Sequence, residues 1–109
     1  MKSPSSKVTA KTHRKTSSGV TKTIIALCDS ELLGKIFEKG DTALDLKNYR
    51  AFYEGSVVSE LQAMELLKKA DNANIVGKKS VEIARKALGF PSESVKKIGG
   101  VPHLQYYKI

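Results

Sequence analysis

Strand-like segments lie at both ends of the chain, and a short turn containing glycine divides each end into two strands. The four segments are 7–14, 20–28, 95–98 and 101–109. Ser17-Ser18-Gly19 and Gly99-Gly100 are typical of the tight turns that join antiparallel neighbours. Strands at both ends of a chain with helices between them predict an α+β fold with a largely antiparallel sheet.

The middle of the chain carries the helical patterns. Asp29 or Ser30 can cap a helix over 31–38, and Gly40 stands where a glycine commonly follows a helix. The apolar face of this helix would comprise Leu32, Leu33, Ile36 and Phe37. Next, 42–46 is a candidate strand and 48–55 a loop.

Two further helices are predicted. Ser59 and Gln62 have the spacing of a capping box, which indicates a helix that starts at this point. Its buried stripe is predicted to be Leu61, Met64, Leu67 and Ala70. The segment 72–76 either continues this helix or turns, and Gly77 breaks it. A last helix is expected over 80–88, with Val81, Ala84 and Leu88 on one face and with Gly89 and Pro91 after it.

At 109 residues the chain has the length of one domain. We expect a flexible start over 1–6 and a single α+β domain over 7–109, with the order ββαβααββ and helices packed on the sheet. The basic N-terminal hairpin would span 7–28. The longest apolar run, 24–28, is far too short to cross a membrane, so no membrane partner is expected.

Basic residues are concentrated at the two ends of the chain. The net charge is +8, residues 1–23 hold six basic side chains and no acid, and residues 78–109 hold seven basic and two acidic ones. Segregated positive charge is typical of a face that binds a polyanion. The residues expected to contact nucleic-acid phosphates are Lys11, Arg14, Lys15, Lys22, Lys78, Lys79, Lys96 and Lys97. A solvated basic surface without a partner is the alternative interpretation.

Glycines next to lysines suggest a second kind of phosphate or ligand site. Gly99-Gly100 could let consecutive N–H groups bind an anion, and the same glycines could simply form a tight turn. Gly77-Lys78-Lys79 lacks the spacing of a P-loop, but a helix start with two lysines can hold a phosphate oxygen. The candidate residues of this corner are Asn74, Gly77, Gly99, Gly100, His103 and Gln105.

Cys28 is the one cysteine, which excludes an intrachain disulfide and fits a reducing compartment. It follows an apolar run and precedes a predicted helix, so it is either a buried core residue or, paired with His103, a nucleophile. We expect no catalytic residue, no metal site and no cofactor. One Cys and two His at distant positions do not make a zinc site.

Four short strings, in order along the chain, are similar to an archaeal family known as domain of unknown function 424. They are Cys28-Asp29-Ser30-Glu31-Leu32-Leu33-Gly34-Lys35, Phe52-Tyr53-Glu54-Gly55, Ala73-Asn74-Ile75-Val76-Gly77 and Ile98-Gly99-Gly100-Val101-Pro102-His103-Leu104-Gln105. The resemblance covers about 20–109. It implies a cytoplasmic archaeal protein whose genes neighbour translation genes, and it carries no activity. The hairpin at the start of this chain is longer and more basic than the family implies.

These observations predict a non-enzymatic protein of the archaeal cytoplasm that is associated with RNA or the ribosome and contacts phosphates through its basic ends. Ribosomal RNA is the expected partner, and a translation factor is a possible one. The second interpretation is a small ligand-binding domain or an enzyme. Its site would join Cys28-Asp29, Asn74 and the corner from Gly99 to His103.

Overall fold

The computed structural model describes residues 7–108, so the flexible start expected over 1–6 lies outside the described residues. Eight strands and three α-helices follow one another along this part of the chain. They are β1 (Val8–Ser17), β2 (Val20–Asp29), β3 (Ile36–Lys39), β4 (Thr42–Asp45), α1 (Arg50–Tyr53), β5 (Ser56–Val58), α2 (Glu60–Lys69), β6 (Asn72–Val76), α3 (Lys78–Leu88), β7 (Lys96–Ile98) and β8 (Val101–Tyr107).

Six strands form one sheet in the order β5-β1-β2-β6-β8-β7, and β3 and β4 form a separate hairpin. Every neighbouring pair in the large sheet is antiparallel except β2 and β6, which run parallel. The predicted α+β class and the largely antiparallel sheet are therefore confirmed. The hairpins expected at the two ends of the chain are β1–β2 and β7–β8.

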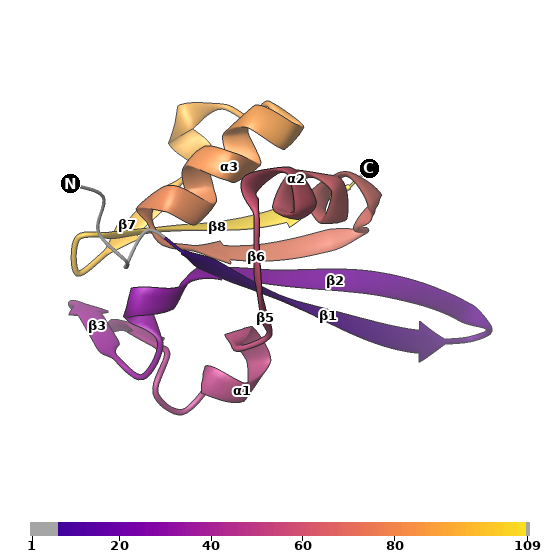
Figure 1. The fold of residues 1–109 in the computed structure, drawn as a ribbon. Helices are drawn as coiled ribbons and strands as arrows, with labels where there is room; N and C mark the ends of the chain where they lie inside the picture. The colour runs from indigo at the N-terminus through magenta and orange to yellow at the C-terminus, as the bar shows by residue number, and fades with distance from the viewer. Residues whose placement is uncertain (1–6, 109) are drawn as a thin grey trace.

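Different elements pack against the two faces of the large sheet (Figure 1). Helices α2 and α3 cover one face, where Ile25, Leu27 and Ile75 belong to the larger core. Helix α1 and the β3–β4 hairpin lie against the other face, over Cys28 and Val76. This alternation along β2 and β6 follows from the period of two in a strand, which points successive side chains to opposite faces.

Helix α2 begins as the sequence predicts. The Ser59 side chain accepts a hydrogen bond from the Gln62 N–H, and the Gln62 side chain accepts one from the Ser59 N–H. The predicted stripe is only partly right. Leu67 and Ala70 are buried and Met64 packs against the larger core, whereas Leu61 is 73% exposed and Ala63, which was not predicted, is buried.

Helix α3 starts at Lys78, two residues before the predicted start. Its predicted inner residues Val81 and Ala84 are buried. Gly89 adopts the left-handed conformation at the end of the helix, with φ +65°, so the predicted stop is confirmed.

The helix predicted over 31–38 is wrong. Only a single 3-10 turn, Ser30–Leu32, forms there, and the chain then enters β3. Gly34 has φ +86°, a conformation that interrupts a helix, and Gly40 lies in the turn between β3 and β4 rather than after a helix. The candidate strand over 42–46 is confirmed as β4.

The segment 72–76 neither continues α2 nor turns: it is β6, a central strand of the sheet. Ala70 has extended backbone angles and ends α2. Ala73 and Ile75 point into the larger core, while the third apolar residue of the strand, Val76, is buried in the smaller core on the other face. The predicted loop 48–55 contains the one-turn helix α1.

Candidate functional site

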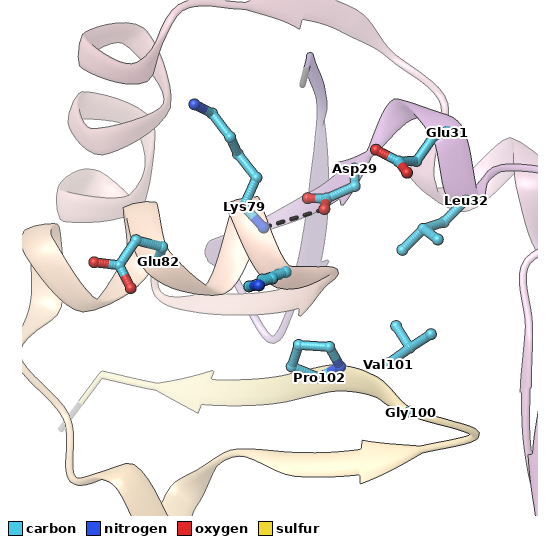
Figure 2. Close-up of a pocket in the computed structure, with 9 residues that line it drawn as sticks. Asp29, Glu31, Leu32, Lys79, Glu82, Gly100, Val101 and Pro102 are labelled. Carbon is cyan, nitrogen blue, oxygen red and sulfur yellow. Dashed lines mark hydrogen bonds between the residues drawn. The ribbon is translucent and has the colours of Figure 1, made fainter. Parts of the chain in front are cut away.

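A pocket of about 660 Å³ lies where β2 ends, α3 begins and β8 leaves the glycine turn (Figure 2). Its lining residues are Asp29, Glu31, Leu32, Lys78, Lys79, Glu82, Gly100, Val101 and Pro102. This pocket brings together part of the ligand site that the second interpretation predicts, because Asp29 and the corner residues Gly100–Pro102 all line it. Three carboxylates face two lysines, so this lining does not favour a polyanion.

Asp29 fills the position at the start of α3 where a phosphate was expected. Its buried carboxylate accepts hydrogen bonds from the N–H groups of Lys79 and Ser80, at 3.1 and 2.8 Å, and from the Ser80 hydroxyl at 2.7 Å. Figure 2 shows the Lys79 side chain extending away from this carboxylate. The N–H groups of Lys79 and Ser80 are therefore already occupied. Lys78 is exposed and Lys79 half-buried, so their side chains stay candidates for phosphate contacts.

Gly77 is the residue that lets Asp29 reach the helix. Its φ is +110°, and a Cβ at this position would lie 2.6 Å from each carboxylate oxygen of Asp29. Gly77 also donates its N–H to the Pro102 carbonyl. The predicted corner residue Gly77 therefore has an architectural role: it holds the end of β2, the start of α3 and the start of β8 together.

Gly99 and Gly100 form the two-residue turn between β7 and β8. Their φ values are +57° and +83°, as expected for a turn that requires positive φ. A Cβ on Gly99 would lie 3.0 Å from the Cβ of Phe37, so the β3–β4 hairpin covers this side of the turn. The geometry fits a tight hairpin turn.

Lys96 and Lys97 lie on opposite faces of the sheet, because they are successive residues of β7. Lys96 stands opposite His103 in the neighbouring strand, and Lys97 stands opposite Pro102. Both lysines are exposed. They cannot hold one phosphate together beside the glycine turn, although each is free to contact a polyanion on its own face.

Cys28 has the properties of a core residue. It is fully buried, and burial, assisted by the nearby Asp29 charge, raises its pKa from 9.0 to about 12. Cys28 pairs with Val76 in the sheet, and Val76 pairs with His103. The thiol and the imidazole are therefore two strands apart, about 9–10 Å, and do not form a nucleophile–base pair.

A second region collects the remaining corner residues on the face of the sheet that carries α1. Asn74 and His103 line a groove of about 390 Å³ beside Tyr49, Phe52 and the β4 residues. Gln105 donates a hydrogen bond from Nε2 to the Asn74 Oδ1 at 3.3 Å. His103 is half-buried, and burial lowers its pKa below 6.5, so the imidazole is neutral at pH 7.

The third region is the outer part of the β1–β2 hairpin, residues 11–23, which we call the arm. β1 pairs with β5 only over Val8–Ala10, and β2 pairs with β6 only over Ile24–Cys28. Beyond those residues the two strands pair with each other alone and project from the body (Figure 1). The arm contains Lys11, Arg14, Lys15 and Lys22 and no acidic residue.

The basic residues of the arm do not all point the same way. Lys15 and Lys22 are directly opposite each other and exposed on the α1 side of the hairpin, while Arg14 is exposed on the other side. Lys11 is half-buried, and its ammonium donates to the Ala51 carbonyl of α1 at 2.6 Å. Of the four residues predicted on this hairpin, three are thus fully available to a partner.

His13 anchors the base of the arm to α1. Its ring stacks on Phe52, with centroids 4.3 Å apart, and its Nε2 lies 2.8 Å from the Phe52 carbonyl oxygen. Next to it, Lys15 and Lys22 line a groove of about 210 Å³ together with Ile24 and Asn72. The arm and the body of the sheet therefore share a continuous surface on the α1 side.

Sequence reasoning missed two features of these sites. It assigned Asp29 to the wrong helix, since nothing local indicates a cap that acts across 50 residues. It also missed Asn72 and Tyr107 as neighbours on one face. The alternation Asn72-Ala73-Asn74-Ile75 is a signal of a strand with one polar face that could have found them.

Taken together, these features describe a small α+β protein with a protruding basic arm and a partly uncovered sheet face. The chain belongs to the family described as "Protein of unknown function (DUF424)", whose profile matches residues 16–109. The expected family is thereby confirmed. The match begins near the tip of the arm, so Lys11, Arg14 and Lys15 lie before it.

A similar fold occurs in a solved structure, described as an uncharacterized conserved protein from Methanopyrus kandleri. The two proteins superpose with a TM-score of 0.76 at 24% sequence identity, over 93% of this chain and 90% of the other. No curated protein matches the sequence. Within residues 7–108, none of the helices has the length and hydropathy to cross a membrane.

Proposed function

We propose that this protein binds RNA without catalysing a reaction, and that the arm is its main contact with the phosphate backbone. The observation that carries the proposal is the pair Lys15 and Lys22, which face each other across the hairpin with no acid on the arm. Like charges directly opposite each other destabilise a sheet. An anionic partner between the two ammonium groups turns this repulsion into attraction.

Solubility alone does not require this arrangement. Lysines on an exposed strand protect it from edge-to-edge aggregation, but that protection does not require two lysines to stand directly opposite each other. The hairpin also extends beyond every other strand, where it contributes little to the core. RNA is favoured over DNA because the family resemblance associates these genes with translation, and ribosomal RNA remains the expected partner.

The experiment is to measure binding of a fluorescent RNA by anisotropy over a range of salt concentrations. About four phosphate contacts on single-stranded RNA give a slope of log K against log salt of about −3. The variant Lys15→Glu/Lys22→Glu should reduce that slope by about 1.4 and weaken binding at low salt. It keeps two like charges opposite each other, so the stability of the hairpin should change little.

The matched control is Lys68→Glu/Lys69→Glu, which changes the net charge equally on exposed residues at the end of α2. An equal loss of affinity in both variants would mean that net charge, and not the arm, attracts RNA. Weak binding that is flat with salt would contradict the proposal. In a native lysate, the protein should sediment with ribosomal subunits and lose that association after nuclease treatment.

The pocket beside Asp29 supports a second candidate function, the binding of a small ligand. Its volume of about 660 Å³ is within the usual range for ligand sites. Its lining combines Glu31 and Glu82 with Lys78 and Lys79, which suits a ligand carrying both charges. Such a ligand would raise the melting temperature of the protein in proportion to the logarithm of its concentration.

A further inference from the structure

Strands β6 and β8 are covered by helices on one side and only partly covered on the other. Ala73, Ile75 and Leu104 are buried beneath α2 and α3. On the α1 side, Val76 and Val101 belong to the smaller core and are buried, and the remaining residues of this face include four that stay partly or fully exposed: Asn72, Asn74, Gln105 and Tyr107. We call this set, together with Ile24, the open face.

The open face continues directly from the arm. In the sheet register, Ile24 pairs with Asn72 and Asn72 pairs with Tyr107, so these three residues form one row. Asn74 and Gln105 form the next row, about 7 Å further along the strands. On the other side of the first row lies the Lys15–Lys22 pair, and all four of Lys15, Lys22, Ile24 and Asn72 line one groove.

The side chains of the open face have the chemistry that recognises nucleobases. Asn72, Asn74 and Gln105 carry amides, each of which offers both donors and an acceptor to the edge of a base. The Gln105 Nε2 donates one hydrogen bond to the Asn74 Oδ1 at 3.3 Å. This bond leaves further donors and acceptors on both amides for a ligand. Tyr107 is 64% exposed, so its ring is available for stacking.

The far end of the open face has a second exposed ring. Tyr49 is also 64% exposed and lines the groove that Asn74 and His103 share. Aromatic rings on an open sheet are a recurrent platform for unpaired bases, because every base has a stacking face. Bases inside a duplex are already stacked and cannot use such a platform.

We infer that the open face binds unpaired bases of single-stranded RNA while Lys15 and Lys22 hold the adjoining phosphates. This inference rests on the proposed function and deepens it, since it names the conformation of the RNA. The positive arm selects a polyanion, and the row of amides and rings beside it selects a strand whose bases are turned outward. The surface of a folded protein lacks the planar row of donors and acceptors that the edge of a base would offer to these amides.

The test compares a single-stranded RNA of 12 nucleotides with a blunt duplex of the same sequence, both measured by anisotropy at one salt concentration. The wild-type protein should bind the single strand at least about ten-fold more tightly than the duplex. Tyr107→Leu should weaken single-strand binding about ten-fold, as loss of one stacked base predicts. Tyr107→Phe, which keeps the ring, should bind like the wild type.

Three comparisons isolate the open face from the arm. Tyr107→Leu and Asn74→Ser should leave both duplex binding and the salt slope unchanged, because they remove no charge. The control Leu61→Ala lies on exposed α2, on the opposite side of the sheet, and should change nothing. Lys15→Glu/Lys22→Glu should weaken binding of both RNAs.

The outcomes separate the two proposals. Equal affinity for the single strand and the duplex, with no effect of Tyr107→Leu, would overturn the open-face inference and leave the arm as a phosphate contact. Tighter binding of single-stranded DNA than of RNA would overturn the assignment to RNA. If the wild-type protein binds neither RNA with a salt-dependent affinity, the proposed function fails, and the open-face inference fails with it.

Discussion

At the scale of single residues, Asp29 and Gly77 determine how the molecule closes. A carboxylate at the end of β2 caps a helix that starts 49 residues later, and it reaches the helix because position 77 has no side chain. The carboxylate is suited to this place, since negative charge at a helix start is stabilised by the free N–H groups and the helix dipole. The two residues together hold α3 against the sheet.

We therefore expect Gly77→Ala to destabilise the protein by about 2–4 kcal/mol. The substitution forces a Cβ into the Asp29 carboxylate and also requires φ +110°, which alanine rarely adopts. Urea unfolding followed by circular dichroism measures the change. Gly19→Ala is the matched control, because a Cβ there meets no atom within 4 Å and only the positive φ is penalised. Similar losses in both variants would contradict the steric role of Asp29.

At the scale of elements, the arm is separate in structure from the core. A shortened protein without Arg14–Ser17 and Val20–Thr23 keeps the Ser18-Gly19 turn and places it between His13 and Ile24, which already pair. We expect its melting temperature to fall by only a few degrees, mainly through loss of the Thr23 hydrogen bonds with Asp71. RNA affinity should fall by more than in Lys15→Glu or Lys22→Glu alone. Calorimetry and anisotropy give the two values.

If the shortened protein failed to fold, or showed no unfolding transition in calorimetry, the separation of arm and core would be wrong. Reduced affinity with a preserved melting temperature would support it. The deleted residues lie beyond those that pair with β5 and β6, so the rest of the sheet keeps its register.

How far the sequence predicts these elements depends on whether the signal is local. The two terminal hairpins, the capping box of α2 and the stop of α3 at Gly89 depend on neighbouring residues, and all four were predicted. The segment 31–38 was not, because Leu32, Leu33 and Ile36 have a helical spacing. In the structure Gly34 takes φ +86°, and residues 36–39 pair with the next strand, β4, as a hairpin. β6 was missed although Asn72-Ala73-Asn74-Ile75 alternates polar and apolar residues, because the segment is short and directly follows a strong helical pattern.

The candidate site divides in the same way. The basic content of the arm is a property of composition and was evident in the sequence. The separation of Lys96 from Lys97 follows from the alternation of side chains within the predicted strand 95–98 and was open to prediction. The separation of Cys28 from His103 depends on the order of the strands in the sheet, which no local pattern contains. The position of Asp29 at the start of α3 required the complete fold.

At the scale of the whole molecule, buried ionisable groups set an upper pH limit to stability. Burial raises the pKa of Cys28 from 9.0 to about 12 and that of Tyr53 from 10.0 to about 12. In the unfolded chain both groups lose their protons near the lower values, while the folded protein retains them. The stability they contribute is complete below pH 9 and falls as the pH rises from about 9 to 12.

We expect the free energy of unfolding to decrease steadily over that range, and urea titrations at a series of pH values measure it. Cys28→Ala removes one of the two groups, so its stability should decline less steeply than that of the wild type. Parallel profiles for both proteins would show that Cys28 titrates normally in the folded state. At pH 7 the buried, protonated thiol of Cys28 should also resist alkylation until denaturant is added.

The parallel pairing of β2 with β6 also has a consequence for synthesis. β2 is the most buried strand of the hairpin and emerges early, but its partner follows after residues 30–71 have been made. At the usual elongation rate, about 5–20 residues per second, one edge of β2 waits roughly 2–8 seconds. During that interval Ile25 and Leu27 are exposed to water beside an unpaired edge. The nascent chain is therefore most vulnerable to wrong pairing before β6 leaves the ribosome.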